Sequence, residues 1–314
     1  MNDENYSRPN LYNELADIFD ADIYLHVGDI IDGKEDETIK WCQNESCRKN
    51  VMLILATYGG SPSAAYRIGR AFQRRVLSTN GNFIIFVPYF CKSAGTLLCF
   101  AANTLIISDR GELGPLDVQL NTRDELIGSS SGATPFQTLS SLRGEAVESF
   151  KRQLFDITYV FPRLSTKSVA EIATKLTVGL LTPLYEHFEP LQIGQAYRSM
   201  MIGKDYGERL ARISDNLQDG AIEKLLFGYP DHAFVIDREE ASTLFKTIER
   251  PSDSLLALER MLEPLFKEKC SGIPVCLHLN NRASSTNDPG TDQVKENRDE
   301  QRRDPPSASD MANK

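Results

Sequence analysis

The chain has 314 residues, of which 41% are hydrophobic and 25% are charged, and its formal net charge is -9. These values are typical of a globular protein large enough to bury a full hydrophobic core. An acidic chain repels phosphate backbones, so we expect no nucleic-acid partner.

The N-terminus and the cysteines narrow the class of protein further. The first residues, MNDENYSRPN, lack the basic-then-apolar layout of a secretory signal, and no apolar run approaches the ~20 residues that span a bilayer. The six cysteines include no Cys-x-x-Cys pair, and the sequence has no G-x-x-x-x-G-K-[ST] phosphate loop. We therefore expect a cytoplasmic protein with no membrane anchor, no metal and no cofactor.

Short β-rich runs alternate with helical patterns along the first third of the chain. In chain order the predicted elements are a strand at Ala21–Val27, a helix at Thr38–Cys47, a strand at Val51–Thr57, a helix at Ser61–Leu77, a strand at Phe83–Val87, a helix at Ser93–Ala102 and a strand at Thr104–Ser108. This alternation predicts an α/β fold with parallel strands joined by crossover helices.

Helical patterns dominate the middle of the chain. After a loop at Asn121–Pro135, the predicted elements are helices at Ser141–Pro162, Val169–Leu176 and Gln192–Met200, a turn at Leu180–Pro190, a strand at Ala233–Ile236 and a helix at Arg238–Ile248. From Asn280 onward the sequence loses nearly all large apolar side chains. Such a segment cannot offset its ordering entropy by burial, so we expect residues 280–314 to be a disordered tail.

Two predicted strands each end in a turn of small residues that enters a helix. Gly59 and Gly60 follow the strand Val51–Thr57, and Ser93 and Ala94 follow the strand Phe83–Val87 after a short turn. If these strands are neighbours in a parallel sheet, both turns lie at its carboxyl edge. One backbone NH from the glycine pair and that of Ala94 can then converge on a developing oxyanion, with Ser93 placed as a nucleophile between them.

The same pattern also has a purely structural interpretation. Serine is a common N-cap and Gly-Gly a common turn, so spacing alone leaves both possibilities open. The α/β-hydrolase motif G-x-S-x-G does not fit, because Cys91 occupies the position of its first glycine.

Three segments carry a resemblance to a known family. They are Ala56–Gly60 (ATYGG), Val87–Leu97 (VPYFCKSAGTL) and Gly111–Gln119 (GELGPLDVQ). Together they resemble the Clp-fold serine proteinases, and most closely the serine dehydrogenase proteinase family, which is related to signal peptide peptidase A. A later segment, Ala170–Tyr197, is similar to the family's later helix and turn.

The resemblance covers roughly residues 20 to 200 and implies a ClpP/crotonase-like fold of repeated β-β-α units. It implies Ser93 as the nucleophile, the NH groups of Ala94 and of Gly59 or Gly60 as the oxyanion hole, peptide bonds as the substrate, and a homo-oligomer. The corresponding domains are an N-terminal arm at 1–20, a protease domain at 21–200, a helical and strand extension at 201–279 packed on it, and the tail at 280–314.

The general base departs from the relatives' pattern. Peptidases of the signal-peptide-peptidase type use a lysine, but residues 94–150 contain none, and the segment 113–120 lacks the histidine of the ClpP type. Of the four histidines, at 26, 187, 232 and 278, His187 is the best candidate, because it lies in the turn that the resemblance brings back to the sheet edge. Lys151 is the second candidate, Asp117 can orient a base or brace the turn, and we expect His232 to be structural.

The leading hypothesis is a serine peptidase that works through an acyl-enzyme on Ser93. Two alternatives stay open. The missing lysine and histidine at the relatives' base positions also fit a catalytically silent binding or assembly scaffold with the same fold. A crotonase-type enzyme acting on acyl-CoA would share the oxyanion geometry, but the serine at the helix start argues against it.

Overall fold

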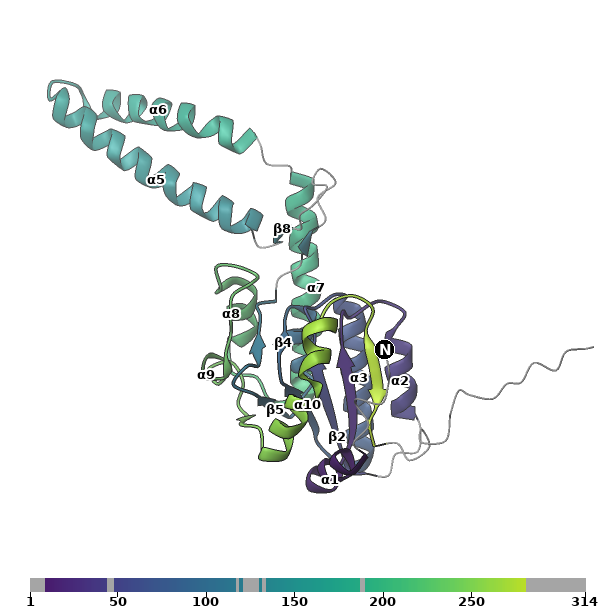
Figure 1. Cartoon of the computed structure of the whole chain (residues 1–314). Coiled ribbons are helices and arrows are strands. Elements are labelled where there is room, and N and C mark those ends of the chain that lie inside the picture. The colour runs from purple at the N-terminus through teal and green to yellow at the C-terminus, as the bar shows by residue number, and fades with distance from the viewer. Residues whose placement is uncertain are drawn as a thin grey trace, which may run out of the picture. The chain divides into compact units, whose positions relative to one another are not determined.

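The computed structural model describes residues 9–43, 48–116, 119–120, 130–131, 134–186 and 190–280. Its main feature is a sheet of six described strands in the order β10-β1-β2-β3-β5-β9, shown in Figure 1. The strands from β1 to β9 run parallel to their neighbours, and β10 pairs with β1 in the antiparallel sense. Helices pack on the sheet, which confirms the predicted α/β class.

The strands of this sheet include all those predicted from the first third of the sequence. They are β1 (Ala21–Val27), β2 (Asn50–Ala56), β3 (Phe83–Val87), β5 (Thr104–Ile107), β9 (Ile248–Glu249) and β10 (Val275–His278). Two further ladders are short: β4 (Phe90–Cys91) pairs with β6 (Glu112–Leu113), and β7 (Gln119–Leu120) pairs with β8 (Ser130–Ser131).

The helices alternate with the strands at first and then follow one another. They are α1 (Pro9–Phe19), α2 (Glu35–Gln43), α3 (Pro62–Thr79), α4 (Ala94–Cys99), α5 (Thr134–Val160), α6 (Thr166–Glu186), α7 (Pro190–Ser214), α8 (Ala221–Phe227), α9 (Arg238–Ala241) and α10 (Asp253–Lys269).

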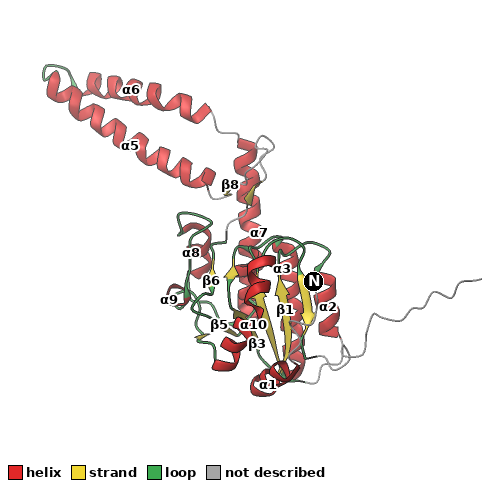
Figure 2. Ribbon diagram, in the orientation of Figure 1, coloured by secondary structure: helices red, strands yellow, loops and turns green. Residues whose placement is uncertain are grey.

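Strand β2 lies between two hydrophobic layers, which explains why its sequence is apolar throughout. Val51, Leu53 and Leu55 pack into the core formed with α3, α4, α7 and α8. Met52 and Ile54, whose side chains alternate with them, pack into the core formed with α1 and α10. Figure 2 shows helices on both sides of the strands.

Helix α3 follows the first small-residue turn, and its ends are fixed by the residues expected there. The Ser61 side chain accepts a hydrogen bond from the amide of Ala64, and Pro62 occupies the first turn, where its missing NH costs nothing. Asn80 ends the helix in a left-handed conformation with φ 51°. These caps set where α3 begins and therefore where the turn at Gly59 and Gly60 ends.

Three sequence predictions for the later part of the chain are wrong. Helix α6 continues through Pro183 to Glu186, where we expected a turn, because a proline can be accommodated in a helix that is held by packing. The predicted strand Ala233–Ile236 is reduced to one antiparallel bridge between Leu113 and Ile236. The predicted helix Arg238–Ile248 ends at Ala241.

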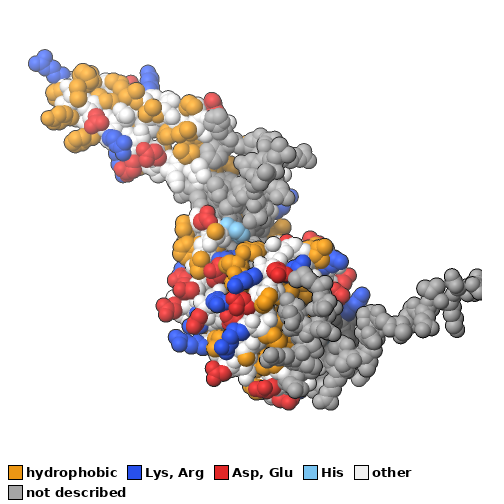
Figure 3. Space-filling view, viewed as in Figure 1, with side chains coloured by type: hydrophobic (Ala, Val, Ile, Leu, Met, Phe, Trp, Pro, Cys, Tyr) orange, Lys and Arg blue, Asp and Glu red, His pale blue; other side chains and the backbone are white. Residues whose placement is uncertain are grey.

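Helices α5 and α6 pack against each other and leave many large apolar side chains exposed (Figure 3). In α6 the buried positions Val169, Ala173, Thr177 and Leu181 recur every four residues, as one helix face must. None of the described helices is both long and apolar enough to cross a bilayer.

The chain up to Asn280 forms one compact unit. Leu15 and Ala16 of α1, which falls in the predicted N-terminal arm, are fully buried in the core. The domain limits at residues 20 and 200 stay predictions, and the predicted tail after Asn280 lies outside the described residues.

Candidate active site

The two small-residue turns lie side by side at the carboxyl edge of the sheet. Strands β2 and β3 are parallel neighbours, and after β2 the backbone continues alongside β4. The amide of Thr57 donates to the carbonyl of Phe90 at 2.7 Å, and the amide of Lys92 donates to the carbonyl of Thr57 at 2.9 Å. This ladder places the residue after Lys92 next to the diglycine turn.

Both glycines of the turn are required by close approach and by backbone conformation. Gly59 has φ +117°, and a Cβ there would lie 2.8 Å from the Cβ of Ser93. Gly60 has φ +132°, and its Cβ would overlap the carbonyl of Ile30. Other residues rarely adopt such angles, so glycine lets the turn reach Ser93 and Ala94.

Two backbone amides at this edge donate to no acceptor among the described residues. The amide of Gly59 is satisfied by the hydroxyl of Thr57 at 2.9 Å, and the bridge to Ile30 uses the carbonyl of Gly59 and the amide of Ser61. That leaves the amide of Gly60 and the amide of Ala94, the first residue of α4, without an acceptor in the described part of the chain. Of the two glycines considered from the sequence, Gly60 therefore has the available donor.

Ser93 has an unusual backbone conformation at the start of α4. Its φ is 51° and its ψ is -114°, a region that glycine favours, and its side chain makes no capping hydrogen bond to the helix. Ser93 thus occupies the N-cap position of α4, but its side chain does not cap the helix. Backbone strain of this kind in a residue other than glycine is concentrated at functional sites, and a sharp strand-to-helix turn is how α/β-hydrolases expose a nucleophile.

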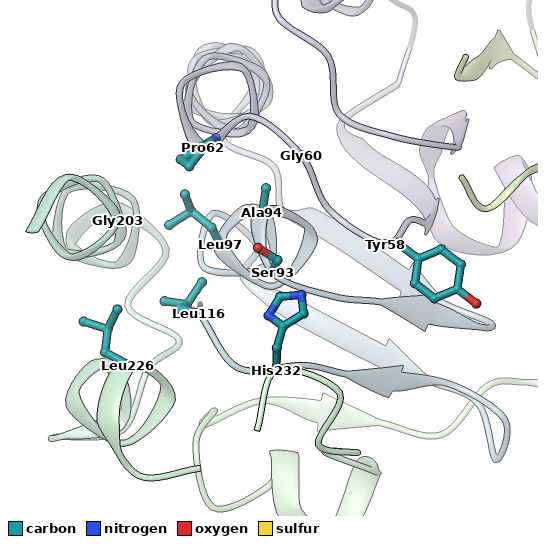
Figure 4. A pocket seen from close by; sticks show the side chains of 10 residues that line it. All are labelled: Tyr58, Gly60, Pro62, Ser93, Ala94, Leu97, Leu116, Gly203, Leu226 and His232. Carbon is teal, nitrogen blue, oxygen red and sulfur yellow. The ribbon is translucent and has the colours of Figure 1, made fainter. Parts of the chain in front are cut away.

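Ser93 lines a cavity of about 190 Å³ together with His232. Figure 4 shows the imidazole of His232 rising from the opposite wall toward the Ser93 side chain. His232 belongs to the loop between α8 and α9, more than a hundred residues after Ser93. A second cavity of about 490 Å³ shares Gly60 and His232 and is lined also by Lys92 and Glu112.

Backbone pairing and a buried lysine hold the loop that carries His232. Leu113 and Ile236 exchange two backbone hydrogen bonds of 2.8 and 3.1 Å. The Lys92 ammonium forms an ion pair with Glu112 at 2.6 Å and donates to the carbonyls of Leu113 and Phe234 at 3.3 Å each. Lys92, which directly precedes Ser93, thus contacts both neighbouring chain segments, one through Leu113 and the other through Phe234.

The contacts of Lys92 also exclude it as the base in this conformation. An ammonium group has three N–H donors and no lone pair. All three donors of Lys92 have acceptors, and its side chain is only 7% exposed beside the Glu112 carboxylate. It neutralises and positions its neighbours instead of accepting a proton.

The other candidate residues from the sequence are either away from the lining of the cavity or outside the described residues. Lys151 lies on α5, is 64% exposed in its side chain and pairs with Glu148 at 2.8 Å. His187 and Asp117 lie outside the described residues. His26 and His278 belong to the paired strands β1 and β10, and burial lowers the pKa of His26 to about 4.

The sequence analysis expected His232 to be structural and gave no role to Lys92, whereas the structure places His232 in both cavities and Lys92 in the second. The signal that could have favoured His232 is its place in a Pro-Asp-His turn beside the single bridge at Ile236, which the sequence suggested as a strand. No group of three or more His, Cys, Asp or Glu side chains in the described ranges is arranged to hold a metal ion.

Comparison with known proteins gives likenesses that cover part of the chain or have low identity. No family model matches the chain. An uncharacterized protein of Methanocaldococcus jannaschii is 36% identical over 72 residues, which are 23% of this chain and 24% of that protein. The chain thus spans about a quarter of the length of this relative.

Among solved structures, the chain is similar to the 1510-N membrane-bound stomatin-specific protease. A serine-to-alanine mutant of it is 13% identical, over 49% of this chain and 70% of that one, with a TM-score of 0.29. A lysine-to-alanine mutant in complex with a substrate peptide is 15% identical, over 49% and 66%, with a TM-score of 0.30. An enoyl-CoA hydratase from Bacillus halodurans is 13% identical, over 63% and 90%, with a TM-score of 0.21.

These scores are too low to assign a family or an activity. The α/β architecture with a mostly parallel sheet is consistent with the ClpP/crotonase-like fold expected from the sequence. What the chain can do chemically therefore depends on its own site.

Proposed function

We propose that the chain is a serine peptidase in which Ser93 is the nucleophile, His232 the general base, and the amides of Gly60 and Ala94 the oxyanion hole. One observation carries this proposal. A serine in a strained backbone conformation lines a cavity opposite an imidazole, and it is flanked by two amides that have no acceptor among the described residues.

Each step of acyl transfer has a group in this arrangement. The hydroxyl oxygen of Ser93 attacks the peptide carbonyl carbon, while His232 accepts the hydroxyl proton. The carbonyl oxygen becomes an oxyanion, to which Gly60 and Ala94 donate. The C–N bond then breaks, His232 gives its proton to the leaving amine, and a water activated by the same imidazole hydrolyses the acyl-enzyme.

His232 replaces His187 and Lys151 as the proposed base because of its place in the cavity. Imidazole is the side chain most often used for this proton transfer. Asp117 remains the sequence-predicted residue for orienting a base, because it directly follows Leu116, which lines the same cavity. Replacing Asp117 with Asn tests that role by its effect on the reactivity of Ser93.

A fluorophosphonate probe tests the proposal without knowledge of the natural substrate. We expect one probe molecule per chain on Ser93, detected by intact mass and peptide mapping, and none on the Ser93→Ala variant. We also expect Ser93→Ala to abolish cleavage in a peptide library. Probe attachment at another residue, or equal labelling of Ser93→Ala, would reject Ser93 as the nucleophile.

The two alternatives make different predictions in the same assays. A silent scaffold would bind peptides without reacting with the probe. The main argument for this alternative was the absence of a base, and it is weaker because His232 lines the same cavity as Ser93. A crotonase-type enzyme would turn over acyl-CoA thioesters in a screen and leave peptides intact.

The proposed peptidase is also a proposed homo-oligomer. Exposed apolar side chains on α5 and α6, including Phe155, Tyr159, Leu176 and Leu180, support self-association, since monomers rarely expose large contiguous apolar patches. Light scattering should give a multiple of 35.2 kDa, and a single 35.2 kDa particle at micromolar concentration would contradict it.

A further inference from the structure

We infer that the cavity beside Ser93 binds an apolar side chain of the substrate on its acyl side, and that Gly203 of α7 sets the size of side chain it accepts. This inference rests on the proposed function. It adds the substrate class, peptides cleaved after an aliphatic residue, and a residue that determines specificity.

The first step is the orientation of the substrate. The 190 Å³ cavity is lined by Ser93 and by both residues with available amides, Gly60 and Ala94. The second cavity is lined by Gly60 and His232 but by neither Ser93 nor Ala94. A carbonyl carbon bound to Ser93 with its oxygen at the two amides therefore places its own side chain in the first cavity.

The second step is the chemistry of that cavity. Away from Ser93 its walls are formed by Pro62, Leu97, Leu116 and Leu226, and no Asp, Glu, Lys or Arg is among its described lining residues. The second cavity contains Asp29, Lys92 and Glu112. Burial of an apolar side chain is favourable in the first cavity, whereas a charged side chain would lose its hydration there without an ionic partner.

The third step concerns Gly203, which lines the cavity from α7 across from Leu97 and Leu116 (Figure 4). One turn later, Gly207 is tightly packed, because a Cβ there would lie 3.0 Å from the Phe100 ring. A Cβ at Gly203 would meet nothing within 4 Å, so the space beside it belongs to the cavity.

The fourth step is that the wall carrying Gly203 is firmly held. The rings of Tyr66 on α3 and Tyr206 on α7 stack with centroids 4.5 Å apart. The Gln73 side-chain amide donates to the carbonyl of Leu210 at 2.9 Å. Lys204 pairs with Glu223 of α8 at 2.8 Å, which links the helix of Gly203 to the helix of Leu226. A side chain added at 203 would therefore fill the cavity and not push the helix away.

The test uses peptidyl diphenyl phosphonates, in which a phosphorus atom replaces the carbonyl carbon of the last residue. The side chain of that residue is that of Ala, Leu or Lys. Ser93 attacks phosphorus, a P–O bond breaks, and phenol leaves with the serine proton. In the wild type we expect the Leu probe to react at least about tenfold faster than the Ala probe, as apolar pockets discriminate by such factors for each added group. The Lys probe should be slower than the Leu probe by at least about the same factor.

The variant pair Gly203→Leu and Gly194→Leu makes the test specific. Gly194 lies on the same helix, is exposed and also has no atom within 4 Å of a Cβ. We expect Gly203→Leu to slow the Leu probe at least about tenfold while the Ala probe changes less than about threefold, and Gly194→Leu to change neither. Gly203→Ala should give an intermediate loss, which covers the case that Gly203→Leu unfolds.

The outcomes separate this inference from the proposed function. Absence of labelling at Ser93 by every probe would overturn both. Labelling of Ser93 with equal rates for the Ala, Leu and Lys probes would overturn the apolar subsite alone. A wild-type preference for Leu that Gly203→Ala and Gly203→Leu leave unchanged would overturn the role of Gly203.

Discussion

The backbone strain at Ser93 predicts that the Ser93→Gly variant is more stable than the Ser93→Ala variant. The φ and ψ of 51° and -114° correspond to the first central position of a type II′ turn, which glycine occupies without steric penalty. The Ser93→Ala variant keeps the Cβ and therefore the backbone strain. The Ser93→Gly variant loses the Cβ and the strain. Neither variant has the hydroxyl. The comparison of Gly with Ala therefore isolates the backbone.

The expected difference follows from two opposing contributions. A residue held in a sparsely populated region costs about 1–3 kcal/mol. Glycine gains more freedom in the unfolded chain, which offsets about 0.5–1 kcal/mol of the relief. We therefore expect Ser93→Gly to be more stable than Ser93→Ala by about 1 kcal/mol. For a chain of this size that corresponds to a rise of about 1–2 °C in the unfolding temperature.

Urea unfolding followed by circular dichroism measures this difference directly. The urea slopes should agree between the two variants, so that a shift in midpoint reports stability. Both variants should be unreactive toward a fluorophosphonate. A Ser93→Gly variant that is less stable than Ser93→Ala, or equally stable, would refute the strain at Ser93 and with it the physical reason for a preformed nucleophile.

Three further predictions concern groups around the site and in the core. Lys92→Met should destabilise the protein by about 3 kcal/mol, because it leaves the Glu112 carboxylate unpaired, and it should slow the labelling of Ser93, because it releases the loop that carries His232. The double variant Lys92→Met/Glu112→Gln should regain stability but not the labelling rate. Unchanged labelling of either variant would contradict the positioning role of Lys92. Thr57→Val should lower the free energy of unfolding by about 1–3 kcal/mol, because the amide of Gly59 loses its acceptor, and an unchanged urea midpoint would oppose this. Burial lowers the pKa of His26 from 6.5 to about 4, so between these pH values the unfolded chain binds a proton that the folded chain does not. Stability should therefore be complete above pH 6.5 and fall by about 3 kcal/mol toward pH 4, and a His26→Gln variant that keeps the same pH slope would disprove the assignment.

The parallel sheet could be predicted because its strands carry their own signal. Val51–Ala56 is apolar on both faces, as burial between two helical layers requires, and the glycine pair at Gly59 marks the turn that follows the strand. The antiparallel strand β10 was not predicted, because its pairing with β1 joins residues about 250 positions apart. The turn predicted at Leu180–Pro190 was wrong as far as Glu186, since tertiary packing keeps Pro183 within α6 against the local preference of proline.

The site could be predicted as far as local geometry determines it. Gly59, Gly60 and Ala94 were placed near Ser93 by the rule that parallel strands end at one edge, and the structure brings these residues together. His232 was expected to be structural, because its place in the same cavity as Ser93 depends on the bridge between Leu113 and Ile236, a contact that no spacing in the sequence reveals. A side chain that a distant loop brings to a site is visible only in the folded chain.

The most direct test of the account is the rate at which a small fluorophosphonate labels Ser93 in the wild type and in His232→Ala. We predict a loss of at least about 100-fold in the variant, as expected for removal of a general base, with partial recovery when imidazole is added to the buffer. The variants Lys151→Ala and His187→Ala should react at the wild-type rate. A His232→Ala variant that labels as fast as the wild type would contradict the account.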